Sequence, residues 1–290
     1  MTAQAGPLDI GDAVPPAGDS LKARHSRLYW AFDDAKSVAR RNLIRYVRLP
    51  QLIVFSTIQP IMFVLLFRYV FGGAIDTGPI PYVDYLMPGI FVQTVLFGAV
   101  STGISLAEDA NTGLLERFRS LPMARSAVLT GRTLADVVRN IVVVILMVVV
   151  GYLVGFRFHA NFAESVLALV LVVLFGYAFS WVAAIVGLRA STPEAAQAAL
   201  FPIIFPLVFA SSAFIPTATM PTWLQWFADH QPVSAVVNAC RQLVLGGYLD
   251  GNQYVAGINW TDIGIALAWT IGIIVVFAPL AVRAYRRKVS

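Results

Sequence analysis

Six long apolar stretches alternate with short polar segments along this chain. About 20 apolar residues in a helix span the hydrocarbon core of a bilayer, so this pattern constrains the fold more than any other feature does. Only 13% of the residues are charged, against about 25% in a typical soluble domain. The sequence therefore predicts an all-α, polytopic membrane protein. Its six transmembrane helices are expected at about 52–71, 88–107, 137–156, 163–188, 195–215 and 263–283.

Lysine and arginine are unevenly distributed between the segments that join these stretches. Most lie in segments 22–48, 117–139 and 283–288, which an even number of spans would place on one side of the membrane. The other side keeps three arginines among acidic residues, namely Arg68, Arg157 and Arg241 beside Asp76, Asp84, Glu164, Asp229, Asp250 and Asp262. Because basic loops stay in the cytoplasm, both termini are predicted to be cytoplasmic.

The N-terminal part precedes the first apolar stretch. Residues 1–27 are expected to form a disordered cytoplasmic tail, because they hold too few apolar residues for a core. Residues 28–49 have the pattern of an amphipathic helix on the membrane surface, with arginines opposite an apolar face. Pro50 would end this helix. The helix at 28–49 is either a plain membrane anchor or a helix that contacts a cytoplasmic partner and relays the motion of that partner to the first span.

Several functional classes are disfavoured. The formal net charge of +5 is explained by basic residues beside the spans, which meet anionic lipid, so no nucleic-acid partner is expected. Cys240 is the single cysteine and the three histidines are scattered, which excludes an intrachain disulfide and indicates no metal site. The spans carry no central charged residue, apart from Arg68 and 136–139 near span ends, which argues against a proton-coupled carrier. An ion channel is also disfavoured, because the sequence contains no TVGYG-type selectivity filter.

The connection between the second and third apolar stretches, residues 108–132, contains a short amphipathic pattern. Leu114, Leu115, Phe118 and Leu121 would share one helical face, and Pro122 would end the helix. The residues Glu116, Arg117 and Arg119 would point elsewhere. Such a helix is suited to docking in a groove of another protein, or it packs against its own domain.

The connection before the last apolar stretch, residues 216–262, is unusually long. It contains two apolar helical pieces, 222–228 and 233–245, separated by a break that includes His230, Gln231 and Pro232. Neither piece is long enough to span, which favours a re-entrant or interfacial hairpin. Trp223 and Trp226 are expected at the headgroup level, and Arg241 is expected to snorkel to the surface.

Taken together, the loop Gly113–Met123 (GLLERFRSLPM) and the segment His230–Gly247 resemble the ABC-2 type exporter permeases. The resemblance covers about residues 28–288 and is strongest to the daunorubicin/doxorubicin-resistance permeases and their actinobacterial relatives that export lipids. It implies a chain that holds no cofactor and lies in a bacterial plasma membrane. The implied partners are two copies of a separate ATPase that uses ATP and magnesium, and a second permease chain, identical or related. The loop and the N-terminal helix would contact the ATPase. The implied coupling residues are Glu108, Asp109, Asn111, Gly113, Leu114, Leu115, Glu116, Arg117, Phe118, Arg119 and Leu121.

The chain itself contains no GxxxxGK[ST] motif, so any ATP hydrolysis is expected in a partner and this chain is not expected to be an enzyme. The sequence thus predicts the permease subunit of an exporter for a hydrophobic or amphipathic compound, drug-like or lipid. Two alternatives remain: a sugar-polymer or glycolipid exporter of the same superfamily, and a non-transporting membrane scaffold or enzyme. No catalytic or substrate-contacting residue is nominated.

Overall fold

The computed structural model describes residues 50–112, 125–250 and 253–289. The expected tail (1–27), the amphipathic helix (28–49) and the loop helix with its coupling residues 113–121 lie outside these ranges. The helices are α3 (Pro50–Leu65), α4 (Tyr82–Asn111), α6 (Arg125–Leu153), α7 (Phe162–Arg189), α8 (Pro193–Phe209), α9 (Thr222–Asp229), α10 (Pro232–Leu245) and α11 (Trp260–Val289). Shorter elements are the π-helix η1 (Leu66–Phe71), the 3-10 turn η2 (Thr217–Thr219) and the strands β1 (Gly247–Asp250) and β2 (Gln253–Ala256).

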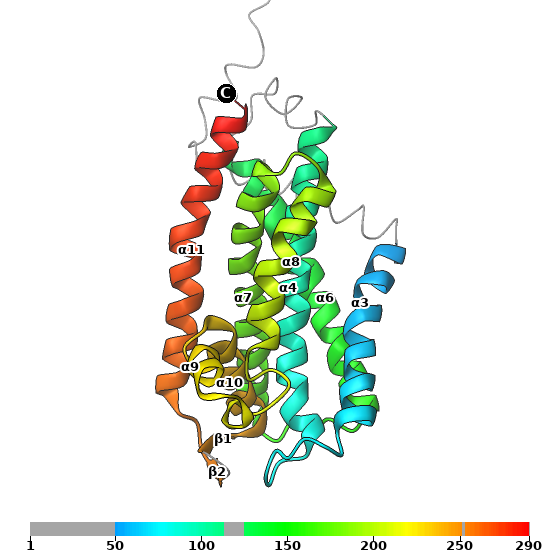
Figure 1. Cartoon of the computed structure of the whole chain (residues 1–290), viewed down its shortest axis with the longest axis vertical. Coiled ribbons are helices and arrows are strands. Elements are labelled where there is room, and N and C mark those ends of the chain that lie inside the picture. The colour runs from blue at the N-terminus through cyan, green and yellow to red at the C-terminus, as the bar shows by residue number, and fades with distance from the viewer. Residues whose placement is uncertain (1–49, 113–124, 251–252, 290) are drawn as a thin grey trace, which may run out of the picture.

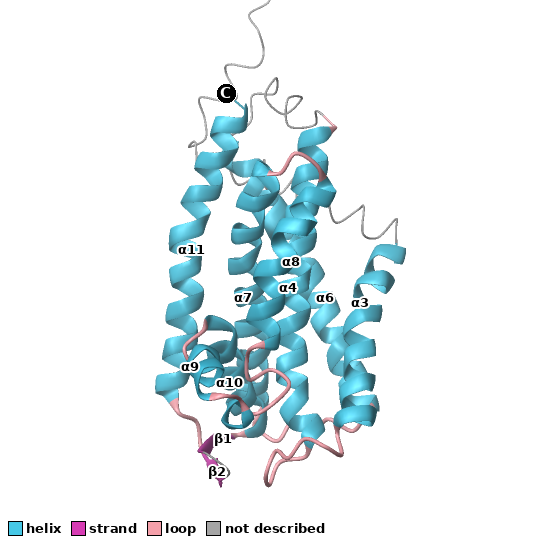
Figure 2. Cartoon of the chain, viewed as in Figure 1, coloured by secondary structure: helices cyan, strands magenta, loops and turns pink. Residues whose placement is uncertain are grey.

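The long helices run side by side along the long axis of the molecule, and the chain reverses direction between successive ones (Figures 1 and 2). The end of α4, the start of α6, the α7–α8 turn and the C-terminus lie at the upper end of Figure 1. The α3–α4 and α6–α7 connections and the segment α9–β2 lie at the lower end. We keep "upper end" and "lower end" for these two groups.

Four helices in the described part of the chain are long and apolar enough to cross a membrane. They are α4, residues 131–153 of α6, α7 and residues 260–288 of α11, which match four of the six expected spans. The other two expected spans correspond to shorter apolar helices, at 57–71 and 193–209. Crossing of the membrane by all six helices stays a prediction.

The two shorter helices differ from the expected spans at their ends. The span expected at 195–215 ends as a helix at Phe209, and at about 26 Å its 17 residues fall just short of a hydrocarbon core of about 30 Å. The following residues turn instead, and Gln231 from the loop before α10 hydrogen-bonds the carbonyl of Ala210. The span expected at 52–71 changes from α-helix to π-helix at Leu66.

Polar side chains mark where α7 and α8 begin. Asn161 precedes α7, and its Oδ1 accepts from the backbone N–H of Glu164 at 2.9 Å, while Glu164 Oε2 accepts from the N–H of Asn161 at 3.2 Å. Thr192 precedes α8 and accepts from the N–H of Ala195 at 3.1 Å, with Pro193 in the first turn. These caps satisfy amide groups that a helix start leaves without partners.

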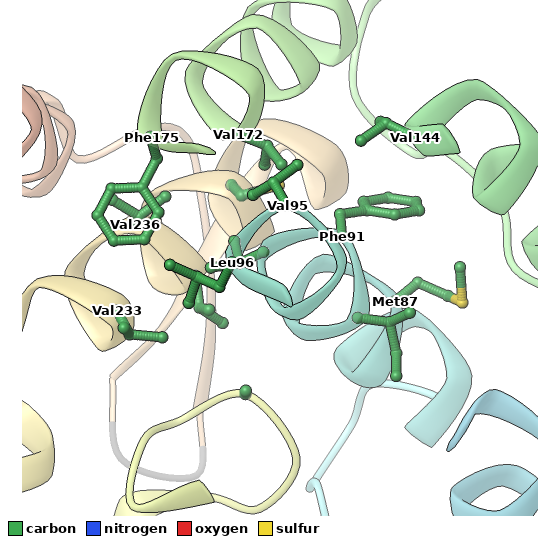
Figure 3. Packing of buried hydrophobic residues seen from close by; sticks show 14 of the residues in the cluster. Met87, Phe91, Val95, Leu96, Val144, Val172, Phe175, Val233 and Val236 are labelled. Carbon is green, nitrogen blue, oxygen red and sulfur yellow. The ribbon is translucent and has the colours of Figure 1, made fainter. Parts of the chain in front are cut away.

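Helix α4 lies at the centre of the core. Met87, Phe91, Val95 and Leu96 are fully buried, and Figure 3 shows them beside side chains of α6, α7 and α10. Helices α4 and α7 pack closely because glycines face each other: a Cβ on Gly187 would collide with the backbone oxygen of Gly103. Small residues at such contacts let membrane helices approach.

The described fold contains a small β-hairpin that the all-α prediction missed. Strands β1 and β2 pair antiparallel, from Gly247 opposite Ala256 to Asp250 opposite Gln253. Gly246 ends α10 in the left-handed conformation, with a φ of 72°, and so redirects the chain into β1. The Tyr254 hydroxyl then donates to the carbonyl of Leu245 at 2.9 Å, which ties β2 back to α10.

Candidate functional site

Three of the predicted coupling residues fall in the described part of the chain, all in the last turn of α4 at the upper end. Glu108 and Asn111 are exposed. Asp109 is less exposed and forms an ion pair with Arg132 of α6. Thr112 follows the last residue of α4, and its hydroxyl donates to the carbonyl of Glu108 at 3.0 Å. The coupling role of these residues, and of residues 113–121, stays a prediction.

Basic residues gather at this same upper end. Arg189 ends α7, and Arg286, Arg287 and Lys288 occupy the last turn of α11. The Nζ of Lys288 donates to the carbonyl of Leu188 at 2.7 Å, so the end of α11 is tied to the end of α7. Cations stabilise helix C-termini, where carbonyl groups lack partners.

The two helices expected before the last span are present as α9 and α10. Trp223 and Trp226 of α9 are 73% and 66% exposed. Their location at the headgroup level stays a prediction. The His230 ring stacks on Trp226, and its Nδ1 lies 2.8 Å from the Trp226 carbonyl oxygen. Pro232 begins α10. Helix α10 packs against α4, α7 and α11, so protein rather than lipid covers most of it. Its insertion into the outer leaflet stays a prediction.

Arg241 does not snorkel: the expectation that it reaches the surface is wrong. The residue is 6% exposed, and its guanidinium lies 3.6 Å from the centroid of the Tyr85 ring. Its nitrogens donate to the carbonyl of Tyr85 at 3.2 Å, to the carbonyl of Ser212 at 2.8 Å and to Asn238 Oδ1 at 2.8 Å. Buried carbonyl groups require donors, and one arginine here serves two of them on separate segments.

A polar pocket of about 170 Å³ lies between α3, α4, α6 and α8. Gln93 of α4 and Asn140 of α6 are 1% and 3% exposed within it, beside Arg139 at 7%. Gln59 of α3 and Gln197 of α8 also line it and are exposed, so they mark its opening.

The position of Arg139 depends on a glycine. Its Nη2 donates to the carbonyl of Gly98 at 2.6 Å and to Asn140 Oδ1 at 3.3 Å. A Cβ on Gly98 would lie 2.6 Å from Asn140 Oδ1 and 2.8 Å from Arg139 Nη2. Glycine at this position therefore lets α4 approach the two polar side chains of α6.

The amide groups in this pocket are left partly unpaired. Within the described residues, Gln93 Oε1, Gln93 Nε2 and Asn140 Nδ2 are buried without a hydrogen-bond partner. An unpaired buried amide is costly, and such groups are rare unless water or a ligand satisfies them. Sequence reasoning noted Gln59 and the charged residues at 136–139 but missed Gln93 and Asn140. The available signal was an isolated amide in an otherwise apolar helix.

Comparison with known proteins places the chain in a family. Residues 34–245 match the ABC-2 type transporter family model. The daunorubicin resistance ABC transporter permease protein DrrB1 of Streptomyces coeruleorubidus is 36% identical over 248 residues, covering 86% of this chain and 84% of that protein. The probable doxorubicin resistance ABC transporter permease protein DrrC of Mycobacterium tuberculosis is 31% identical over 254 residues, covering 85% and 86%. The putative transport permease ycf38 of Porphyra purpurea is 25% identical over 248 residues, covering 82% of each chain. The chain therefore belongs to the ABC-2 type transporter family.

Proposed function

We propose that this chain is the membrane-spanning permease subunit of an ATP-driven exporter that moves a hydrophobic or amphipathic drug-like compound out of a bacterial cytoplasm. The observation that carries the proposal is the match to the daunorubicin resistance permease over 86% of the chain. The helical bundle with a polar pocket in its interior supports it. A protein that serves only as a scaffold has no need of such a pocket, because unpaired polar groups inside a bundle destabilise it.

The orientation follows from the charges at the two ends of the bundle. The upper end holds Arg132, Arg189 and the basic last turn of α11, whereas the lower end holds Asp76, Glu164 and Asp262 among its acidic residues. The positive-inside rule supports our proposal that the upper end, and with it both termini, lies in the cytoplasm. Helices α3 and α8 would then cross the membrane with the four longer helices, giving six crossings.

The energy would come from outside this chain. ATP and magnesium would bind to a separate ATPase, present in two copies, and a second permease chain would complete the pathway. The ATPase would dock at the upper end, on the segment that follows Glu108 and Asp109. ATP binding would then shift the permease between two states, because the ATPase binds one of them more tightly.

The test is transport in inverted membrane vesicles from cells that express the tagged chain together with its ATPase. We expect daunorubicin to accumulate in the vesicles when ATP and magnesium are supplied, and the ATPase to co-purify with the tag. Vesicles whose ATPase lacks the phosphate-binding lysine of its GxxxxGK[ST] motif are the matched control. ATP hydrolysis by the purified chain alone, or equal accumulation with and without ATP, would contradict the proposal.

A further inference from the structure

A second polar pocket, of about 290 Å³, lies at the lower end of the molecule. It is lined by α4, the turn after α8, α9, α10, β1 and the start of α11, whose lower-end positions Figure 1 shows. Arg241 and Gln242 in its wall are buried, whereas Ala218 is exposed and marks the opening. The volume is at the small end for ligand sites, so the pocket suits a small polar group rather than a drug-sized molecule.

Arg241 keeps hydrogen-bonding capacity for a ligand in this pocket. A guanidinium has five N–H groups, and those of Arg241 make one hydrogen bond from Nε, one from Nη1 and two from Nη2. One N–H of Nη1 is left over. All the acceptors are neutral oxygens, including Asn238 Oδ1, and Arg241 makes no ion pair within the described ranges. The Nδ2 group of Asn238 lies beside it as a second donor. Two such donors at an arginine suit an oxyanion such as phosphate.

A carboxylate lines the same pocket. Asp262 lies in the first turn of α11, and its Oδ2 accepts from Gln242 Nε2 at 2.6 Å. In the part of the chain that the structure describes, its Oδ1 has no hydrogen bond and the residue makes no ion pair. Arg241 and Asp262 thus bring opposite charges to one pocket without pairing with each other. A ligand that carries both an oxyanion and an ammonium group complements both, whereas a ligand with one charge would meet a like charge.

The surface of α11 beside the pocket indicates a lipid. Asp262, Ile265, Trp269 and Gly272 recur every three or four residues and so share one face of α11. Ile265 and Trp269 are 48% and 42% exposed, and no atom lies within 4 Å of a Cβ added to Gly272. From Asp262 to Gly272 the helix rises about 15 Å, half of a hydrocarbon core of about 30 Å. An apolar face one leaflet long, which we call the α11 strip, therefore begins at the carboxylate of the pocket.

We infer that this pocket binds the zwitterionic headgroup of a phosphatidylethanolamine-type lipid from the leaflet at the lower end. The phosphate accepts hydrogen bonds from Arg241 and Asn238, the ammonium group donates to Asp262, and the acyl chains lie along the α11 strip. The bound headgroup bridges α10 and α11. The inference goes beyond the proposed transport function and does not depend on it.

The test is native mass spectrometry of the detergent-purified chain, titrated with three lipids that share dioleoyl chains. Phosphatidylethanolamine carries both charges, phosphatidylglycerol carries the phosphate alone, and a dioleoyl aminopropane carries the ammonium alone. We expect phosphatidylethanolamine to bind about tenfold more tightly than either other lipid, the change that one charge-assisted hydrogen bond produces. Glycerophosphoethanolamine, the same headgroup without chains, should compete only weakly with the lipid.

Two substitutions separate the headgroup from the chains. Asp262→Asn keeps an oxygen that can accept from Gln242 but removes the negative charge, and should abolish most of the preference for phosphatidylethanolamine over phosphatidylglycerol. Asp229→Asn, at the exposed end of α9 and outside the pocket, is the matched control and should keep it. Trp269→Ala should weaken both lipids by about fivefold without changing their ratio. Val275→Ala, on another face of α11, should weaken neither.

Equal affinities for phosphatidylethanolamine and either other lipid would overturn the inference, as would an Asp262→Asn protein that keeps the full preference. Competition by glycerophosphoethanolamine as strong as that by the lipid would contradict a lipid ligand and indicate a water-soluble zwitterion. The comparison of the three lipids needs no variant, so it decides even if Asp262→Asn does not fold. Loss of daunorubicin transport with the lipid preference intact would contradict the proposed function but not this site.

Discussion

Arg241 of α10 and Tyr85 of α4 are 156 positions apart in the chain, yet the Tyr85 carbonyl accepts hydrogen bonds from Arg241 at 3.2 Å. The guanidinium also lies over the Tyr85 ring, 3.6 Å from its centroid. The same side chain donates to the carbonyl of Ser212, in the turn between α8 and α9. One buried cation thus joins the lower part of α4 to two other segments.

Replacing Arg241 should therefore destabilise the lower end. In Arg241→Met the carbonyls of Tyr85 and Ser212 each lose the arginine as a donor, although the Tyr85 hydroxyl still donates to the Ser212 carbonyl at 3.1 Å. We expect a loss of about 1–3 kcal/mol in the free energy of unfolding. Thermal unfolding of the detergent-solubilised protein measures it. Arg287→Met, at the exposed end of α11, is the control and should change stability little. Equal melting temperatures for the two variants would contradict the structural role of Arg241.

Because α4 and α7 approach closely at Gly187, Gly→Ala substitutions at two positions should change the free energy of unfolding in opposite directions. Gly187→Ala places a methyl group against the backbone of Gly103, and should cost about 1–3 kcal/mol through strain. Gly272→Ala on α11 has no atom within 4 Å of the new methyl group, and should be neutral or stabilising by up to about 1 kcal/mol. Denaturation of both variants under the same conditions checks the difference. A Gly187→Ala protein as stable as Gly272→Ala would show that α4 and α7 are not in close contact.

The predicted coupling helix can be tested although it lies outside the described residues. If its apolar face fills a groove in the ATPase, Phe118→Ala should weaken docking by about 2 kcal/mol, roughly 30-fold in Kd. Glu116→Lys should weaken it further by charge repulsion. Co-purification of the ATPase and ATP-driven export measure both. Phe162→Ala is the control, because Phe162 is an exposed aromatic residue at the lower end. Normal docking and export by Phe118→Ala and Glu116→Lys would remove this loop from the mechanism.

The sole cysteine allows a test of orientation. Cys240 is fully buried, and burial raises the pKa of its thiol to about 12. Maleimides react with the thiolate, so we expect Cys240 to be labelled in unfolded but not in folded protein. Added cysteines at two exposed positions, Ala74→Cys at the lower end and Ser191→Cys at the upper end, then report the sides of the membrane. An impermeant maleimide applied to spheroplasts should label the first and not the second. The reverse pattern would invert the proposed topology.

The family and most of the helices could be predicted from local sequence patterns. The match over residues 34–245 confirms the resemblance to ABC-2 permeases that the loop and hairpin motifs indicated. Helices α9 and α10 appear within one residue of the predicted ranges 222–228 and 233–245, because the proline and polar residues that separate them act locally. Four expected spans match long apolar helices for the same reason: about 20 apolar neighbours need no distant partner to favour a helix in a bilayer.

Tertiary structure decided the features that depend on residues far apart in the chain. The sequence around Arg241 shows a lone cation in an apolar segment. Such a side chain has its lowest free energy at the surface unless buried acceptors exist. Those acceptors belong to α4 and to the turn after α8, so no local pattern reveals them. The polar pocket likewise forms where Gln93 of α4 and Asn140 of α6 line one space, with Gly98 leaving room for Asn140 and Arg139. Sequence by itself determined a bundle of apolar helices with basic residues concentrated in alternate connections, because hydrophobicity acts residue by residue. The burial of each polar group was decided by packing, because its free energy depends on which partners the fold places beside it.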